Sequence, residues 1–197
     1  KIDGNKISFQ LGSYNENEGL IIDPVVRLWG TYYGGSDQDI SRAIAIDNNG
    51  NIFMVGRTFS DNGIAPTGAH QTTRNGAYEG FVVKFDSNGV RQWGTYYGGM
   101  SNDDITSCAT DDDGNLFLSG STKSSSDIAT VGSHQSIFGG GYSDAFLVKF
   151  NTDGARQWGT YYGGSDHDYS NFVAVKNGNV YLVGYTTSTT GIATAGS

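Results

Sequence analysis

The chain has 197 residues and a formal net charge of −8, because 20 acidic side chains outnumber 12 basic ones. No basic cluster interrupts this acidity, so the sequence lacks the positive patch of a nucleic-acid binder, and anionic membranes would repel it. No apolar run reaches the roughly 18 residues that a membrane span needs. The single cysteine, Cys108, excludes an internal disulfide and a multi-cysteine metal site. Thirty glycines, two prolines and 13% aromatic residues indicate many tight turns between β-strands.

The first 28 residues form a lead-in segment with two apolar runs. Ile7–Leu11 and Leu20–Leu28 both predict strands, and Pro24 makes the second an edge or bulged strand. The chain begins at Lys1 without an apolar leader. We therefore expect either that a leader has been removed or that the chain is part of a longer protein.

A seven-residue motif, Trp-Gly-Thr-Tyr-Tyr-Gly-Gly, then occurs three times. Its copies begin at Trp29, Trp93 and Trp158, so the repeat is about 64 residues long. Other columns keep this spacing: Gly56, Gly120 and Gly184, and His70-Gln71 with His134-Gln135. The chain thus divides into the lead-in, residues 1–28, and tandem repeats, residues 29–197, that start near residues 29, 93 and 158.

Each repeat predicts four short strands. In the first full copy these are Ala43–Asp47, Ile52–Thr58, Phe81–Phe85 and Val90–Tyr97. The turns inside the two strand pairs, Asn48–Gly50 and Asp86–Gly89, contain Asn-Gly, which favours hairpins because these residues accept positive φ. A longer polar connection joins the pairs, and no segment has helical periodicity.

Four strands about a fixed period are typical of a β-propeller blade. We therefore predict an all-β fold, a β-propeller of four-stranded blades, with about three blades present and the repeated Trp and Tyr-Tyr side chains packed between them. A β-solenoid is the alternative, but its coils usually repeat about every 20–30 residues, which is shorter than the repeat of this chain. Because a ring needs about four blades, the chain is either a fragment or an incomplete ring that pairs with its own N-terminal strands or with another molecule.

Several repeat columns match a known pattern. They are Trp29–Ser36, Asp39, Ile44–Asp47, Gly50-Asn51, Gly56, Thr58, Ser60, His134-Gln135 and Asp144–Phe150. On these residues the chain resembles the SBBP β-propeller repeat family over about residues 27–197. The resemblance implies a secreted or surface-attached bacterial protein. It implies no catalytic residues, because the family has no common activity.

An aspartate column follows the Gly-Gly pair of each motif: Asp39, Asp103 and Asp168. These carboxylates either cap backbone N–H groups, bind a cation or hydrogen-bond a sugar. A second column, His70 and His134, has either a structural role or a ligand contact. Acidic turns such as Asp111–Asn115 resemble calcium loops in part. No closing glutamate follows them, and Lys176 replaces the first aspartate in the third copy, so Ca²⁺ is the alternative to a structural turn.

Because these columns repeat, whereas catalytic residues are normally unique in a chain, we predict no enzyme, no catalytic residue and no resident cofactor. The predicted function is a non-enzymatic extracellular or cell-surface module for adhesion, binding or structural display. A polysaccharide or a surface protein is the expected partner, bound by the variable loops Phe59–Glu79 and Lys123–Ser143. Self-association through open blade edges is also expected. The alternatives are a glycan-active hydrolase or lyase at the propeller mouth and a passive structural spacer.

Overall fold

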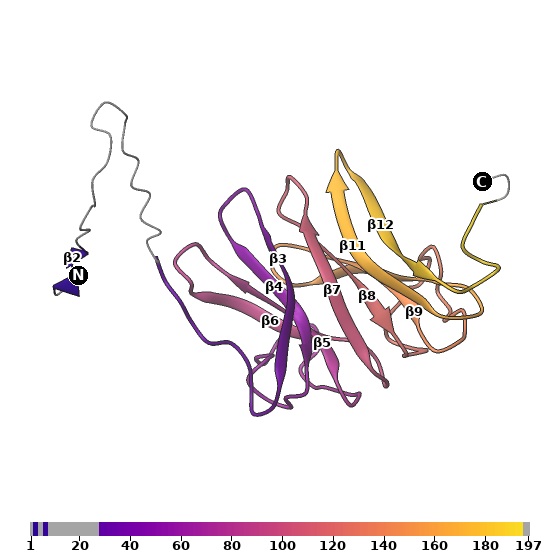
Figure 1. Cartoon of the computed structure of the whole chain (residues 1–197), viewed down its shortest axis with the longest axis horizontal. Helices are drawn as coiled ribbons and strands as arrows, with labels where there is room; N and C mark the ends of the chain where they lie inside the picture. The colour runs from indigo at the N-terminus through magenta and orange to yellow at the C-terminus, as the bar shows by residue number, and fades with distance from the viewer. Residues whose placement is uncertain (1, 4–5, 8–27, 195–197) are drawn as a thin grey trace, which may run out of the picture.

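The computed structural model describes residues 2–3, 6–7 and 28–194. Within them all regular structure is antiparallel β-sheet (Figure 1), so the predicted all-β fold is confirmed. The described residues accordingly contain no helix that is long and apolar enough to cross a membrane. Of the predicted lead-in strands only Ile7 and Leu28 are described, with Ile7 in the short pair β1 (Ile2–Asp3) and β2 (Lys6–Ile7).

Two four-stranded sheets and one two-stranded sheet follow. Blade 1 contains β3 (Asp39–Ile46), β4 (Ile52–Thr58), β5 (Glu79–Phe85) and β6 (Arg91–Tyr97). Blade 2 contains β7 (Asp103–Thr110), β8 (Leu116–Thr122), β9 (Asp144–Phe150) and β10 (Arg156–Tyr162). The half-blade contains β11 (Asp168–Lys176) and β12 (Asn179–Thr186). In every sheet the strands pair in chain order, as expected for hairpin-connected blades.

The repeat motif lies in the last strand of each blade rather than at its start. Trp93 lies in β6 and Trp158 in β10, and both strands pair with the strand before them. The first copy, beginning at Trp29, has no assigned strand, because no neighbouring strand pairs with it among the described residues. Residues 28–35 are therefore equivalent to the outer strand of a blade that would precede blade 1.

The first strand of blade 1 is longer than predicted. It begins at Asp39 rather than Ala43, and its polar start pairs in register with the end of β4, Asp39 opposite Thr58. A register shift between Ser41 and Ala43 interrupts this pairing and breaks the apolar alternation on which the prediction depended. The polar residues at the start of β3 therefore belong to the sheet.

The innermost strands bring the blades together. Figure 1 shows β3, β7 and β11 side by side; β7 packs against β3 and β4, and β11 packs against β7 and β8. Side chains from both blades fill the junction between blades 1 and 2, including Phe53, Val55, Ile105 and Leu118, all with 0% exposure. Burial of this apolar area is the main force that holds the two sheets together.

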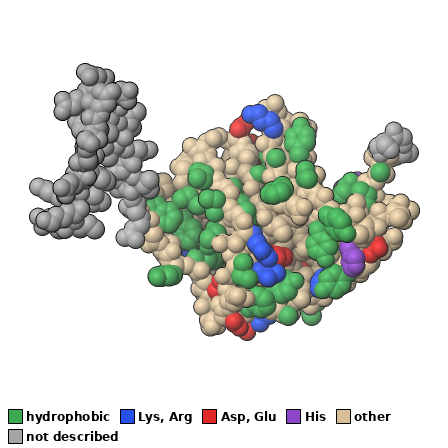
Figure 2. Space-filling model, in the orientation of Figure 1, with side chains coloured by type: hydrophobic (Ala, Val, Ile, Leu, Met, Phe, Trp, Pro, Cys, Tyr) green, Lys and Arg blue, Asp and Glu red, His purple; other side chains and the backbone are tan. Residues whose placement is uncertain are grey.

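Each end of the row of sheets exposes residues whose counterparts are buried. Ile44 of blade 1 is 64% exposed, whereas Cys108 in the same column is 8% exposed. In the half-blade, Tyr181 and Val183 are 56% and 60% exposed, although Phe53 and Val55 occupy those columns in blade 1. Hydrophobic side chains are visible over both ends of the row (Figure 2). The described chain is thus an open row of blades with two uncovered apolar faces.

Candidate functional site

The repeated aspartates lie where one blade connects to the next. Asp103 accepts hydrogen bonds from the Gly99 N–H and the Ser124 hydroxyl, both over 2.9 Å, and from the Thr122 hydroxyl. Asp39 has the same three kinds of donor, and Asp168 accepts from Gly164 N and Ser188 Oγ over 2.7 and 2.8 Å. The carboxylate therefore ties the Gly-Gly connection to the end of the second strand in each copy.

A second carboxylate faces the aspartate at two of these junctions. A Cβ atom placed on Gly98 would lie 2.3 Å from both Glu79 Oε1 and Asp103 Oδ2, so the two acids converge on this glycine. Burial and the neighbouring Glu79 charge raise the pKa of Asp103 to about 7, and burial also raises the pKa of Glu79. At the next junction, burial and the Asp168 charge raise the pKa of Asp144 to about 6.

The variant Asp103→Asn should change the pH dependence of stability. The folded pKa near 7 lies above the ordinary value of 3.8, so the folded carboxyl holds a proton that the unfolded chain releases between these values. The stabilisation is therefore complete below about pH 4 and lost as the pH rises through about 7. Because asparagine does not titrate, the stability advantage of the wild type should shrink by about 2–3 kcal/mol between pH 5 and pH 8.

Urea unfolding of both proteins at the two pH values measures this difference. His70, whose titration has the opposite sign, is present in both proteins and cancels in the comparison. An advantage that stays constant from pH 5 to pH 8 would contradict the assignment of a buried, protonated Asp103.

The tryptophan and the second tyrosine of the first two motifs contact the following blade. Trp93 Nε1 donates to Thr152 O of blade 2 over 3.0 Å, and its ring centroid is 6.5 Å from that of Phe150. Tyr97 donates to Ile128 O of blade 2 over 2.8 Å, whereas Tyr96 donates to Ser60 O of its own blade over 2.8 Å. The predicted packing between blades is confirmed for the tryptophan and the second tyrosine, while the first tyrosine bonds within its blade.

The repeated histidines pack on the second tyrosine of the motif. The His70 ring stacks on Tyr97 at 6.1 Å and meets the edge of Phe150 at 5.5 Å, and His134 stacks on Tyr162 at 5.8 Å. Partial burial, with a smaller effect of Arg156, lowers the pKa of His70 to about 4, so this ring is neutral near pH 7. The described residues contain no group of three His, Cys, Asp or Glu side chains able to share a metal ion.

The acidic turns use their carboxylates locally. Asp47 Oδ1 accepts from Asn49 N and Asn51 N over 2.9 Å, and Asp111 accepts from its own turn in the same way. Burial of Asp47 acts to raise its pKa, but hydrogen bonds from Asn51 and Asn49 outweigh burial, so its pKa lies below the ordinary value. These contacts explain the Asp-x-x-Gly-Asn pattern through the turn that it stabilises.

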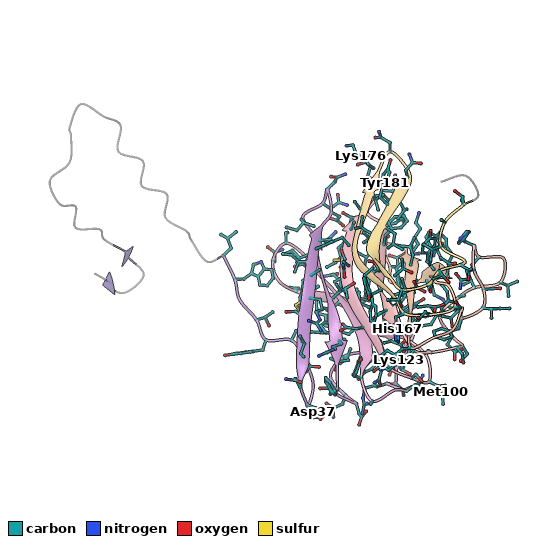
Figure 3. All side chains as sticks on the ribbon, turned by 45° about the vertical axis from the view of Figure 1, so that its right-hand side comes forward. Asp37, Met100, Lys123, His167, Lys176 and Tyr181 are labelled. Atoms are coloured by element: carbon teal, nitrogen blue, oxygen red, sulfur yellow. The ribbon has the colours of Figure 1, made fainter. Side chains whose placement is uncertain are left out.

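The long connections within blades and the connections between blades lie at one end of the sheets, which we call the loop face. It carries the connections 59–78, 98–102, 123–143 and 163–167. Figure 3 places Asp37, Met100, Lys123 and His167 toward this end, and Lys176 and Tyr181 toward the opposite end. The loop face thus contains both of the variable loops that the sequence indicates as binding regions.

Two clusters of cationic and aromatic side chains lie on the loop face. In the first, the Arg57 guanidinium lies 5.0 Å from the Tyr78 ring centroid and pairs with Asp104, which also binds Arg42. In the second, Lys123 Nζ lies 3.5 Å from the Tyr142 ring centroid, and the edge of His167 meets that ring at 5.3 Å. Tyr142 is 54% exposed, so the second cluster presents an aromatic ring and a cation to solvent.

The repeat alignment contains a signal for these clusters that residue types alone do not give. Lys123 stands where the other copies have Phe59 and Thr187, and His167 stands where they have Gln38 and Asn102. Departure from a repeat column marks positions that the blade architecture leaves free to vary. Neither the aspartate nor the histidine column belongs to these two clusters.

Comparison with known proteins gives a repeat family and a curated relative. The SBBP model, described as a β-propeller repeat, matches residues 28–64 and 92–127. The regulatory protein FlaEY of Caulobacter vibrioides is 26% identical to the chain over 162 residues. That alignment covers 80% of this chain and 16% of FlaEY, so the chain spans a small part of the length of its relative.

Proposed function

Because the chain contains SBBP β-propeller repeats, we propose that it is a non-enzymatic extracellular or cell-surface module for adhesion, binding or structural display. The observation that carries this proposal is that repeated and non-repeated side chains make different contacts. Repeated aspartates and tyrosines bond to neighbouring strands and blades, whereas non-repeated aromatic and cationic side chains gather on the loop face. Such repeats generally serve as structural modules on which loops carry the specific contacts.

The second cluster of the loop face is the proposed contact site. Tyr142 offers a ring to a sugar or to an apolar side chain, and Lys123 beside it favours a partner with acidic groups. A polysaccharide with carboxylate groups or an acidic surface protein satisfies both requirements. The net charge of −8 would repel such a partner elsewhere, which would direct contact to this cluster.

Binding to an array of bacterial polysaccharides, followed by titration of the hits, tests this proposal. Tyr142→Ala should weaken binding about tenfold or more, because exposed aromatic side chains supply much of the energy of such contacts. Tyr181→Ala is the matched control, since Tyr181 is similarly exposed, at 56%, but lies at the opposite end of the sheets (Figure 3).

Equal loss in both variants would overturn the assignment of the loop face. Hydrolysis or elimination of a polysaccharide by the wild-type chain, without stable binding, would overturn the non-enzymatic function and favour the glycan-active alternative.

A regulatory role is the second candidate, and it is supported by the name of the relative FlaEY. A module that binds another protein through its loop face could serve such a role without any change in architecture. Binding to an acidic protein but to no polysaccharide in the same assay would favour this candidate.

A further inference from the structure

The half-blade ends in a strand with an unoccupied side. In blade 1 the second strand, β4, pairs with both β3 and β5, and β8 does the same in blade 2. Among the described residues β12 pairs with β11 alone. One row of its backbone N–H and C=O groups therefore faces no strand, and such an edge is a template for another strand.

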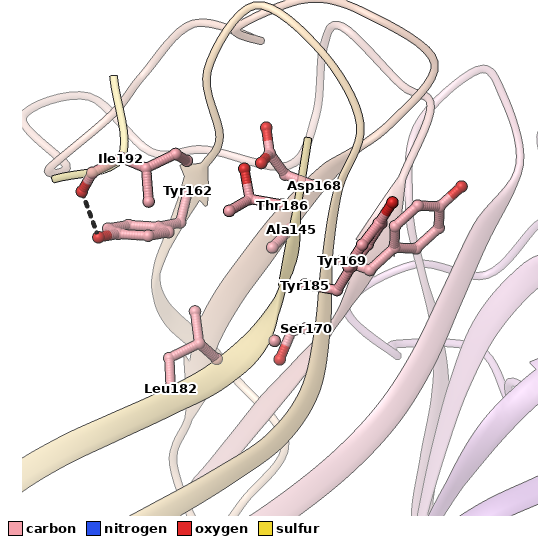
Figure 4. A pocket seen from close by; sticks show the side chains of 10 residues that line it. Ala145, Tyr162, Asp168, Tyr169, Ser170, Leu182, Tyr185, Thr186 and Ile192 are labelled. Carbon is pink, nitrogen blue, oxygen red and sulfur yellow. Dashed lines mark hydrogen bonds between the residues drawn. The ribbon is translucent and has the colours of Figure 1, made fainter. Parts of the chain in front are cut away.

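A pocket of about 230 Å³ lies beside this edge, between the half-blade and blade 2 (Figure 4). Its lining includes Ala145, Tyr162, Asp168, Ser170, Leu182 and Gly184. Tyr162 closes one side of the pocket by donating to Ile192 O over 2.8 Å. Ala145, Tyr162 and Leu182 give the pocket apolar walls. The heavy atoms nearest to a Cβ placed on Gly184 are backbone atoms of Tyr169 and Ser170 rather than a side chain from another strand.

The complete junction between blades 1 and 2 shows what fills the equivalent space. There Tyr97 and Gly120 occupy the columns of Tyr162 and Gly184. The ring of Phe146, from the third strand of blade 2, lies 5.4 Å from the Tyr97 ring, and a Cβ placed on Gly120 would be 2.8 Å from it. Phe146 has 0% exposure, so at the complete junction a phenylalanine fills this space.

Polar atoms at the incomplete junction also lack partners. In the described part of the chain, Asp168 Oδ1 and Ser170 Oγ are buried without a hydrogen-bond partner, although both residues line the pocket. At the complete junction the corresponding Oδ1 of Asp103 accepts from Thr122. Buried polar atoms without partners are costly, which favours an arrangement in which a further strand orders the end of β12.

We propose that the free side of β12 and this pocket form an acceptor for an added β-strand whose phenylalanine fills the pocket. The occupant is an extended peptide with the sequence of the third strand of the repeat, as in Asp144–Phe150, followed by its hairpin partner. Backbone hydrogen bonds to β12 supply affinity, and the pocket selects the phenylalanine. The lining of the pocket does not include Lys123, Tyr142 or His167, so its test and that of the proposed function can fail independently.

The probe is a fluorescein-labelled synthetic peptide of residues 144–162, titrated with the chain at concentrations where sedimentation shows a monomer. The anisotropy should rise to saturation. A peptide with Phe146→Ser should bind about tenfold or more weakly, because it loses the burial of one aromatic ring. Leu147→Ser, on the opposite side of the same strand, is the control peptide and should bind nearly as well as the parent.

Two variants of the chain locate the site. Leu182→Glu places a charge in the lining of the pocket and should abolish saturable binding, whereas Tyr181→Glu, the next residue along β12, should retain it. Circular dichroism checks that both variants are folded. The proposal is overturned if the parent peptide does not bind, if Phe146→Ser binds as well as the parent, or if a polysaccharide competes for the pocket better than the peptide.

Discussion

Replacing Tyr97 by alanine should destabilise the chain by about 3–5 kcal/mol, whereas the same replacement at Tyr162 should cost about 1 kcal/mol. Both residues are the second tyrosine of the motif, and both donate to an isoleucine carbonyl over 2.8 Å. Tyr97 has 0% exposure and lies 5.4 and 5.8 Å from the rings of Phe146 and Phe150, whereas Tyr162 is 36% exposed. The main difference between the two sites is therefore the third strand of the following blade. It lies beside Tyr97, and among the described residues no such strand lies beside Tyr162.

Urea unfolding measures both changes as shifts in the midpoint at a constant slope. The hydroxyl contribution can be separated with Tyr97→Phe, which should cost about 1 kcal/mol because it removes a buried hydrogen bond, and with Tyr162→Phe, which should cost less than about 0.5 kcal/mol because its hydrogen bond is exposed. Equal costs for the two alanine variants would show that the junction between complete blades adds nothing to stability, which would contradict the packing described above.

Gly120→Ala should lower the free energy of unfolding by more than about 3 kcal/mol or prevent folding. Such a change is among the largest that single substitutions cause. Gly120 lies opposite Ile105 in the β7–β8 pair, next to the register shift between Ile105 and Ser107. A Cβ there would lie 2.0 Å from the backbone carbonyl oxygen of Asp104, and backbone cannot move aside as a flexible side chain can. The same approach recurs at Gly56 and Gly184, which explains the glycine column.

Gly132→Ala is the control for this prediction. Its backbone φ is +79°, but no atom lies within 4 Å of the position that a Cβ would take. Only the cost of a left-handed conformation remains, about 1 kcal/mol. Thermal unfolding compares the two variants, and a Gly120→Ala protein that melts within a few degrees of the wild type would contradict the close approach.

The local sequence pattern of turn and strand residues was sufficient to predict the hairpins. Residues 52–58 were predicted correctly as a strand because their boundaries are set by a turn with Gly50 at φ +77° and by the polar loop after Thr58. The start of β3 was not predictable in this way, since its polar residues join the sheet through Asp39 and a register shift. The motif at Trp29 shows a third case: its sequence matches β6 and β10, yet a strand also needs a partner.

The candidate sites could likewise be predicted only in part from the sequence. Repetition alone identified Asp39, Asp103 and Asp168 as one column, but it does not reveal that Glu79 or Asp144 shares a junction with two of them. Those partners come from a different strand and differ in residue type between copies. The Lys123, Tyr142 and His167 cluster was hidden for a related reason, because its members are brought together from two connections by the folding of two sheets.

Amide hydrogen exchange along β8 and β12 tests the central claim most directly, because these strands occupy the same place in a complete and an incomplete blade. β8 pairs on both sides, and β12 pairs on one side within the described chain. We predict that amides of β12 exchange roughly tenfold or more faster than those of β8, and that the peptide of residues 144–162 slows exchange in β12 alone. Equal protection of the two strands without peptide would contradict the open half-blade.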